Sequence, residues 1–176
     1  MTQFLGIDIG GTKIAGVVLT DTHTVVREHQ IETPRDDYNQ FLNALVNFIT
    51  HLDQRMLLPV GIGMPGALSL EDQRVKNSDI PCVKGEALQT DLQSRIGRDV
   101  RIENDANCFA LSEAVDGAAA GAEVVFGVIL GTGTGGALVV HEQLIQGVNR
   151  IAGEWGHNPM PFVKAEDLPG PECYCG

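Results

Sequence analysis

Two glycine-dense turns, each beside hydroxyl or carboxyl side chains, are the segments of this sequence best suited to chemistry. The first, Gly10-Gly11-Thr12-Lys13, follows Asp8, and the second, GTGTGG, begins Gly131-Thr132-Gly133-Thr134. Glycine permits positive φ and lets a ligand approach bare backbone N–H donors, which suits phosphate groups. A carboxylate at the end of a buried strand, such as Asp8, suits Mg²⁺. Two such turns on similar strands indicate an internal duplication whose halves face each other across a phosphate.

A second candidate is the pair Asn104-Asp105, which lies where a strand gives way to a helix. Asn and Asp are the best helix N-caps, so for an isolated pair the capping interpretation is favoured. The functional interpretation is that Asp105 is the general base for an attacking hydroxyl and Asn104 fixes the acceptor. Ligands bind at the carboxyl ends of strands in α/β sheets, and a carboxylate there can accept a hydroxyl proton as a phosphoryl group is transferred.

A third set of candidates lies in the last quarter of the chain. Glu154 and His157 can point at one hydroxyl-rich ligand, with Gly153 and Gly156 allowing close approach. A surface turn with an incidental histidine accounts for the same spacing equally well. His157, Cys173 and Cys175 are also three zinc-type ligands, one fewer than a closed structural site needs.

The GTGTGG turn also satisfies the G-x-G-x-x-G pattern of dinucleotide-binding sites. That pattern requires a helix directly after the turn, whereas Ala137-Leu138-Val139-Val140 indicates a strand. Either turn alone is also compatible with a plain hairpin. The two together, beside Asp8, favour phosphate binding, and no Walker-type G-x-x-x-x-G-K-[ST] occurs in the sequence.

The elements that position these residues follow from hydrophobic periodicity. Apolar runs predict strands over 3–9, 13–20, 24–31, 58–64, 100–103, 123–130 and 136–140. Residues at i, i+3, i+4 spacing predict helices over 37–54, with Asp36 as the cap, over 87–96 and over about 105–117. The run DGAAAGAE suggests a hinge. We therefore expect an N-terminal domain over 1–118 and the start of a second domain over 119–176.

Composition excludes several classes of protein. A net charge of −11 argues against nucleic-acid binding, and no apolar run is long enough to span a membrane. The N-terminus enters directly as a strand and has no signal-peptide pattern, and the cysteine usage suggests a reducing compartment. We therefore expect a cytoplasmic protein with no nucleic-acid or membrane partner.

Taken together, these segments resemble the ROK family of sugar kinases, which has the α/β fold of actin-like, hexokinase-like ATPases (ribonuclease H-like). DIGGTK is similar to the family's first phosphate motif, LGTGTGG to the second, ENDAN to the catalytic segment, and GEWGH with CYCG to the sugar and zinc segments. The resemblance covers essentially the whole chain. Within the family, TPRDDY and AGEWGHNPMP look most like the fructokinase branch, with N-acetylglucosamine kinases as near relatives.

The resemblance implies ATP-dependent phosphorylation of a hexose at its 6-hydroxyl, with Asp105 as the base and Asp8 positioning Mg²⁺. It assigns the nucleotide phosphates to Gly10, Gly11, Thr12, Lys13, Gly131, Thr132, Gly133 and Thr134. It assigns the hexose to Gly66, Asn104, Asp105, Glu154 and His157, and a structural Zn²⁺ to His157, Cys173 and Cys175.

The resemblance also sets three further expectations. The chain stops inside the zinc motif, so these 176 residues are expected to be a fragment and inactive alone, with a homodimer as the state of the full-length protein. Fructose is the expected substrate, and N-acetylglucosamine or another hexose is the alternative within the family. A non-catalytic sugar-sensing regulator is the alternative from another class, and the presence of both Asp8 and Asp105 favours the kinase.

Overall fold

A five-stranded mixed sheet forms the larger part of the molecule. The computed structural model describes residues 1–131, 133–170 and 172. The sheet has the order β3-β2-β1-β4-β7, in which β1 pairs antiparallel with β2 and parallel with β4. Its strands are β1 (Gln3–Ile9), β2 (Lys13–Thr20), β3 (Val25–Glu32), β4 (Val60–Met64) and β7 (Val100–Asn104). Because β1, β4 and β7 run parallel, their carboxyl ends meet at one edge, where Asp8, Gly63 and Asn104 lie.

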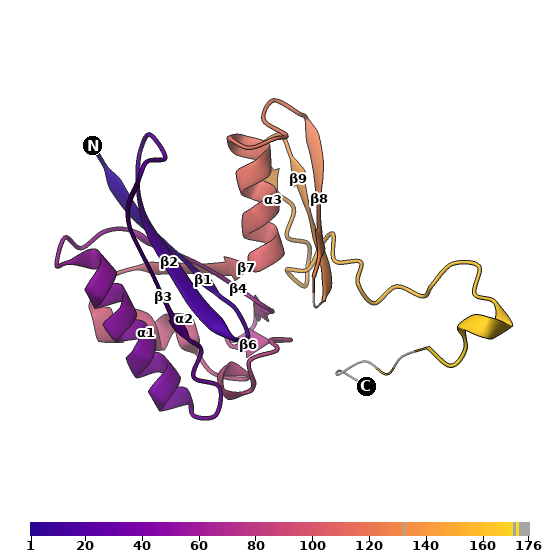
Figure 1. Ribbon diagram of the computed structural model, residues 1–176, viewed down its shortest axis with the longest axis horizontal. Helices are drawn as coiled ribbons and strands as arrows, with labels where there is room; N and C mark the ends of the chain where they lie inside the picture. Colours follow the sequence, from indigo (N-terminus) through magenta and orange to yellow (C-terminus); the bar gives the residue numbers. More distant parts are fainter. Residues whose placement is uncertain (132, 171, 173–176) are drawn as a thin grey trace.

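Two helices, α1 (Tyr38–Asp53) and α2 (Leu88–Ile96), pack on this sheet and on each other (Figure 1). The cap of α1 is Asp37, whose Oδ1 accepts a hydrogen bond from the Gln40 N–H at 2.8 Å. The expectation of Asp36 was therefore wrong by one residue. Helix α2 ends at Gly97, which has a left-handed φ of 69°. The core beneath the helices consists of large side chains, including Phe41, Leu45 and Ile49, which are at most 1% exposed.

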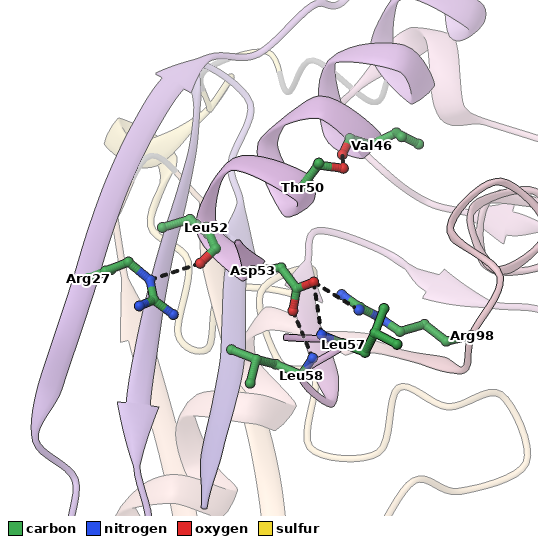
Figure 2. Close-up of polar contacts among 8 residues, drawn as sticks. All are labelled: Arg27, Val46, Thr50, Leu52, Asp53, Leu57, Leu58 and Arg98. Atoms are coloured by element: carbon green, nitrogen blue, oxygen red, sulfur yellow. Dashed lines mark hydrogen bonds and ion pairs between the residues drawn. The ribbon is translucent and has the colours of Figure 1, made fainter. Parts of the chain in front are cut away.

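The end of α1 is tied to the sheet by a buried ion pair (Figure 2). The Asp53 carboxylate accepts hydrogen bonds from the N–H groups of Leu57 and Leu58 and pairs with Arg98 at 3.1 Å. Nearby, Arg27 Nε donates to the carbonyl of Leu52 at 2.9 Å, which joins β3 to the same helix. These contacts fix the helix end opposite the cap.

A second, smaller sheet is formed by β8 (Val124–Leu130), β9 (Thr134–Val140) and β10 (Gln143–Leu144). Helix α3 (Asp105–Val115) packs on one of its faces and follows β7 without a break (Figure 1). The packing core here consists of Ala110, Ala114, Ala137 and Val139. By packing, α3 thus belongs with the second sheet, although the expected domain boundary at 118 falls after it; that boundary stays a prediction.

The remaining described elements are short. Strands β5 (Ala67–Leu68) and β6 (Val75–Lys76) form a small hairpin, and single 3₁₀ turns lie at Pro81–Val83 and Ala165–Asp167. Beyond residue 157 the chain leaves the second sheet as an extended, largely exposed segment (Figure 1). In the described part of the chain, no helix combines the length and apolar character needed to cross a membrane.

Candidate active site

The pair Asn104-Asp105 lies at the junction of β7 and α3. Asn104 is the N-cap of α3, and its Oδ1 accepts a hydrogen bond from the Asn107 N–H at 3.1 Å. The capping interpretation is therefore confirmed. The same side chain also donates from Nδ2 to the carbonyl of Gly66 at 3.0 Å, which links the end of β7 to the loop after β4. One asparagine thus fixes both the start of the helix and a neighbouring loop.

Gly66 itself occupies a position that only glycine fits. Its φ is +91°, and a Cβ built on it would lie 2.4 Å from the carbonyl oxygen of Lys76. A larger residue would push the loop away from Asn104.

Asp105 is the first residue of α3, and its Oδ1 accepts a hydrogen bond from the Ala106 N–H at 2.9 Å. Desolvation by burial raises the pKa of its carboxyl group, and the negative charges of Asp79 and Glu154 raise it further. Hydrogen bonds from the backbone N–H groups of Ala106 and of Asp105 itself lower the pKa, but they do not outweigh the burial. A carboxylate with a raised pKa is a stronger base, which suits it to accepting a hydroxyl proton.

Asp8 lies across a cavity of ≈ 370 Å³ from α3. The cavity is lined by Ile7, Asp8, Gly63, Asp105, Cys108, Phe109 and Ile129. Although Asp8 is exposed at the cavity opening, the surrounding protein atoms desolvate its carboxyl group and raise its pKa; the charge of Asp105 adds to this, and that of Lys13 opposes it. A divalent cation would stabilise the ionised form of Asp8 beside the second carboxylate of Asp105, so these two residues fit Mg²⁺.

The first glycine turn connects β1 and β2 as a tight hairpin. The Gly10 N–H donates to the Lys13 carbonyl at 2.8 Å, and Thr33 holds the turn by donating from Oγ1 to the Gly10 carbonyl at 2.7 Å. Neither Gly10 nor Gly11 has positive φ, so the expectation that this turn needs glycine for a positive φ was wrong. What requires glycine at position 11 is space, because a Cβ there would lie 2.9 Å from Oδ2 of Asp79.

The second glycine turn connects β8 and β9. Leu130 pairs with Thr134, and the Gly131 N–H donates to the Gly133 carbonyl at 2.9 Å; Thr132 lies outside the described residues. The turn leads into a strand and not a helix, so the dinucleotide-binding alternative is wrong. Ile129, just before this turn, and Asp8, just before the first, line the same cavity.

The loop that carries Glu154 lies directly on β9. Trp155 Nε1 donates to the Gly135 carbonyl at 2.9 Å, and a Cβ on Gly156 would lie 2.2 Å from the Thr134 carbonyl oxygen. Oε1 of Glu154 accepts hydrogen bonds from the N–H groups of Trp155 and Gly156. Because the charge of Glu154 acts on Asp105, the fold brings these two carboxylates to one site across 49 residues of sequence.

The zinc expectation falls mostly on residues that cannot be described. His157 follows the Glu154 loop and is exposed, while Cys173 and Cys175 lie outside the described residues. Within 1–131, 133–170 and 172, no three His, Cys, Asp or Glu residues are grouped so as to hold a metal ion. The zinc site stays a prediction.

Two residues of the site were missed by sequence reasoning. Asp79 brings a carboxylate against Gly11 and acts on Asp105, yet it lies between the predicted strand 58–64 and the predicted helix 87–96, where the sequence predicts no element. Glu103 stands next to Asn104 in the ENDAN segment, and its carboxylate accepts hydrogen bonds from three donors. Its place beside Asn104 and Asp105 could have marked Glu103 as a candidate. Its contact with Gln146 could not be predicted, because Gln146 is distant along the chain.

Comparison with known proteins gives one family. The model of the ROK family matches residues 4–176. An N-acetyl-D-glucosamine kinase of Shigella flexneri serotype 5b (strain 8401) is 42% identical over 180 residues, covering 99% of this chain and 59% of that protein. The chain therefore spans somewhat more than half the length of the curated relatives that it matches.

Solved structures show the same relationship. The ROK hexokinase from Thermus thermophilus superposes with a TM-score of 0.80 at 31% identity, covering 99% of this chain and 57% of that one. A ROK family glucokinase from Streptomyces griseus, crystallised with glucose and AMPPNP, superposes with a TM-score of 0.78 at 29% identity, covering 89% of this chain and 50% of that one. The expected fold class is confirmed.

Proposed function

Because this chain belongs to the ROK family, we propose that the complete protein transfers a phosphoryl group from ATP to the 6-hydroxyl of a hexose. N-acetylglucosamine is the first candidate acceptor, since the curated relatives at 42% identity are named N-acetyl-D-glucosamine kinases. This supports the alternative over fructose, which the motifs alone favoured.

The observation that carries the proposal is the placement of Asp105. Its carboxylate stands at the first residue of α3, lines one cavity with Asp8, and has a raised pKa. A sugar hydroxyl hydrogen-bonded to this carboxylate would give up its proton as its oxygen attacks the γ-phosphoryl group.

The acceptor side of the site is assigned to Gly66, Asn104, Glu154 and His157. Asn104 already uses Oδ1 for Asn107 and one Nδ2 proton for Gly66, which leaves its second N–H for a sugar oxygen. Glu154 uses Oε1 for two backbone N–H groups, which leaves Oε2 to accept from a sugar hydroxyl. These internal contacts orient both side chains before a sugar binds, which reduces the entropy cost of binding.

The nucleotide side is assigned to the two glycine turns. Backbone N–H groups of Gly10, Gly11, Thr12, Gly131, Thr132, Gly133 and Thr134, with the Lys13 ammonium, would hold the phosphates. Asp8 would hold Mg²⁺, which supplies charge neutralisation on the phosphates when bound. His157, Cys173 and Cys175 remain the proposed zinc ligands.

The test is an ATP-consumption assay on the complete protein with N-acetylglucosamine, fructose, mannose and glucose, comparing wild type with Asp105→Asn. Removal of a general base is expected to lower kcat about 10²- to 10⁴-fold, while calorimetry still detects sugar binding. Asp99→Asn, an exposed aspartate at the other end of β7, is the matched control and should retain wild-type kcat.

Each other outcome has a distinct meaning. Wild-type turnover in Asp105→Asn would remove the base assignment. Sugar binding by the wild type without any ATP consumption would replace the kinase with the sugar-sensing regulator.

A further inference from the structure

The Glu103 side chain makes hydrogen bonds to residues on both sides of the proposed base, Asp105. Its Oε1 accepts hydrogen bonds from the Asn104 N–H at 2.8 Å and from Asn107 Nδ2 at 3.0 Å. These two residues flank Asp105 and Ala106, so one carboxylate oxygen fixes the backbone immediately before the proposed base and the side chain two residues after it. The Glu103 side chain is partly buried, where a hydrogen bond to an anion is worth more than one in water.

The second oxygen of Glu103 reaches the other sheet. Oε2 accepts a hydrogen bond from Nε2 of Gln146, in the segment that follows β10. Gln146 in turn begins the turn that leads to Glu154: its carbonyl accepts from the Ala152 N–H at 3.1 Å, and the Glu154 N–H donates to the Ile151 carbonyl at 3.1 Å. A short chain of hydrogen bonds therefore runs from the base-bearing segment to the loop that carries Glu154.

All three groups that face this carboxylate are donors. An ionised glutamate is an acceptor only, and its two oxygens satisfy Asn104, Asn107 and Gln146 together. No neutral side chain of the same shape can do so, because an amide offers one acceptor oxygen and places a donor where the second oxygen was.

We propose that Glu103 and Gln146 are a positioning pair that sets the place of the Glu154 loop relative to Asp105. This inference rests on the proposed kinase function, in which Asp105 takes the hydroxyl proton of an acceptor that Glu154 helps to hold. The pair itself touches neither substrate. Its contribution is to fix the position of the acceptor-binding loop relative to the base, since the two sheets that carry them have separate packing cores.

Exchanging the partners tests the pair. In Gln146→Glu two carboxylates face each other, and the bridge is lost. In Glu103→Gln the bridge survives only if Gln146 turns its amide oxygen toward the new N–H, so a neutral hydrogen bond replaces the charge-assisted one. In the double variant E103Q/Q146E, the amide at 103 keeps its oxygen toward Asn104 and Asn107 and donates to the new carboxylate at 146. Every hydrogen bond of the wild type is restored with the charge moved. Exposed Gln143→Glu is the matched control for a new charge near Gln146.

Two readouts are measured on the complete protein. The first is hydrogen exchange in peptides covering 103–109 and 151–157, which needs no activity. The second is kcat and KM for the hexose that the wild type phosphorylates. Gln146→Glu is expected to speed exchange in 151–157 and to lower kcat/KM about ten- to a hundredfold, chiefly through KM. Glu103→Gln is expected to change both less, and the double variant to recover both.

The outcomes separate the possibilities. Lower thermal stability of Gln146→Glu with unchanged kcat, KM and exchange in 151–157 would make the pair ordinary structure and overturn the proposal. A double variant no better than Gln146→Glu would overturn it as well. If Glu103→Gln does not fold, Gln146→Ala removes only the donor and is scored by the same two readouts. A wild-type protein that phosphorylates no hexose would refute the kinase function, whereas the exchange comparison would still test the link.

Discussion

The two sheets of this molecule are stabilised in different ways. The first sheet and its helices enclose large side chains such as Phe41 and Leu45, both 0% exposed. The second sheet meets α3 through small residues, and a Cβ on Gly127 would lie 2.6 Å from the Cβ of Ala110. A small-residue contact lets the helix approach the sheet closely but buries little apolar area.

This difference bears on where the proposed site lies. The other face of the second sheet is open, with Val124, Phe126, Val128 and Leu130 more than 40% exposed. Asp8 belongs to the first sheet, Asp105 to the helix between the sheets, and Ile129 to the second sheet, and all three line one cavity. The proposed site thus lies between the large-residue core of the first sheet and the small-residue core of the second. Where so little apolar area is buried, polar contacts such as that of Glu103 with Gln146 contribute more to holding the two sheets in place.

The largest expected effect separates the two cores directly. Phe41→Ala should lower the free energy of unfolding by about 3–5 kcal/mol, because a fully buried aromatic ring leaves a cavity. Val139→Ala, at 1% exposure in the second core, should cost only about 1.5 kcal/mol, since about two methylene equivalents are lost. Urea unfolding of the complete protein measures both. Equal losses of unfolding free energy would show that the second core contributes as much to stability as the first.

How far the sequence predicts this arrangement depends on the range of the interaction. Strands 3–9 and 13–20 and the N-cap Asn104 follow from local periodicity and capping chemistry, and they match the structure. The position of Asp79 against Gly11 does not, because the turn 10–13 carries no mark of a carboxylate 68 residues away.

Helix α3 shows the same limit at the level of packing. Its alanines at 106, 110 and 114 recur every four residues, a signal for close approach to a partner. The pattern does not say which sheet that partner is. The expected boundary at 118 therefore followed the glycine-rich composition of the hinge, whereas packing associates α3 with the strands after it.

The next effect concerns the ion pair at the end of α1. Burial alone would raise the pKa of Asp53, but hydrogen bonds from Arg98, Leu58 and Leu57 outweigh it and hold the pKa below its usual range. Asp53→Asn leaves Arg98 without its partner and should cost about 2–3 kcal/mol of unfolding free energy. Because the folded pKa is lowered, this contribution is present above the unfolded value of about 3.9 and is lost as the pH falls through the folded pKa.

Chemical denaturation at several pH values measures this contribution. The matched control is Asp72→Asn, whose carboxylate pairs with Arg74 at 3.8 Å with both side chains about half exposed, so a much smaller change is expected. A stability difference between wild type and Asp53→Asn that stays constant from pH 7 to below pH 3 would contradict the linkage.

A smaller effect tests the tie between Asn104 and the loop after β4. Gly66→Ala should cost at least about 1–3 kcal/mol from positive φ, and its Cβ would also collide with the Lys76 carbonyl. Gly97→Ala is the control, because φ there is +69° but nothing lies within 4 Å of the added carbon. Only Gly66→Ala should also raise KM for the hexose, since the Gly66 carbonyl accepts a hydrogen bond from Asn104 and Gly97 has no such contact with it. Equal KM values in the two variants would separate Gly66 from the acceptor site.

The smallest expected effect is electrostatic and concerns Asp79, which follows β6 and places a negative charge near Asp105. Burial is the main cause of the raised pKa of Asp105, and the charge of Asp79 adds to it. A base acts in its deprotonated form, so kcat/KM should fall as the pH drops through that raised pKa.

Asp79→Asn removes one negative charge, lowers the pKa of Asp105, and should move the acidic limb of the pH–rate profile to lower pH. Asp72→Asn, in the loop between β5 and β6, is not among the charges acting on Asp105 and should leave the limb in place. The midpoint of the limb, and not the size of kcat, is the quantity to compare, because Asp79 also packs against Gly11 and its replacement can change the rate by displacing that turn. An acidic limb that shifts upward in Asp79→Asn would mean that Asp79 favours the ionised base, opposite in sign to a neighbouring negative charge.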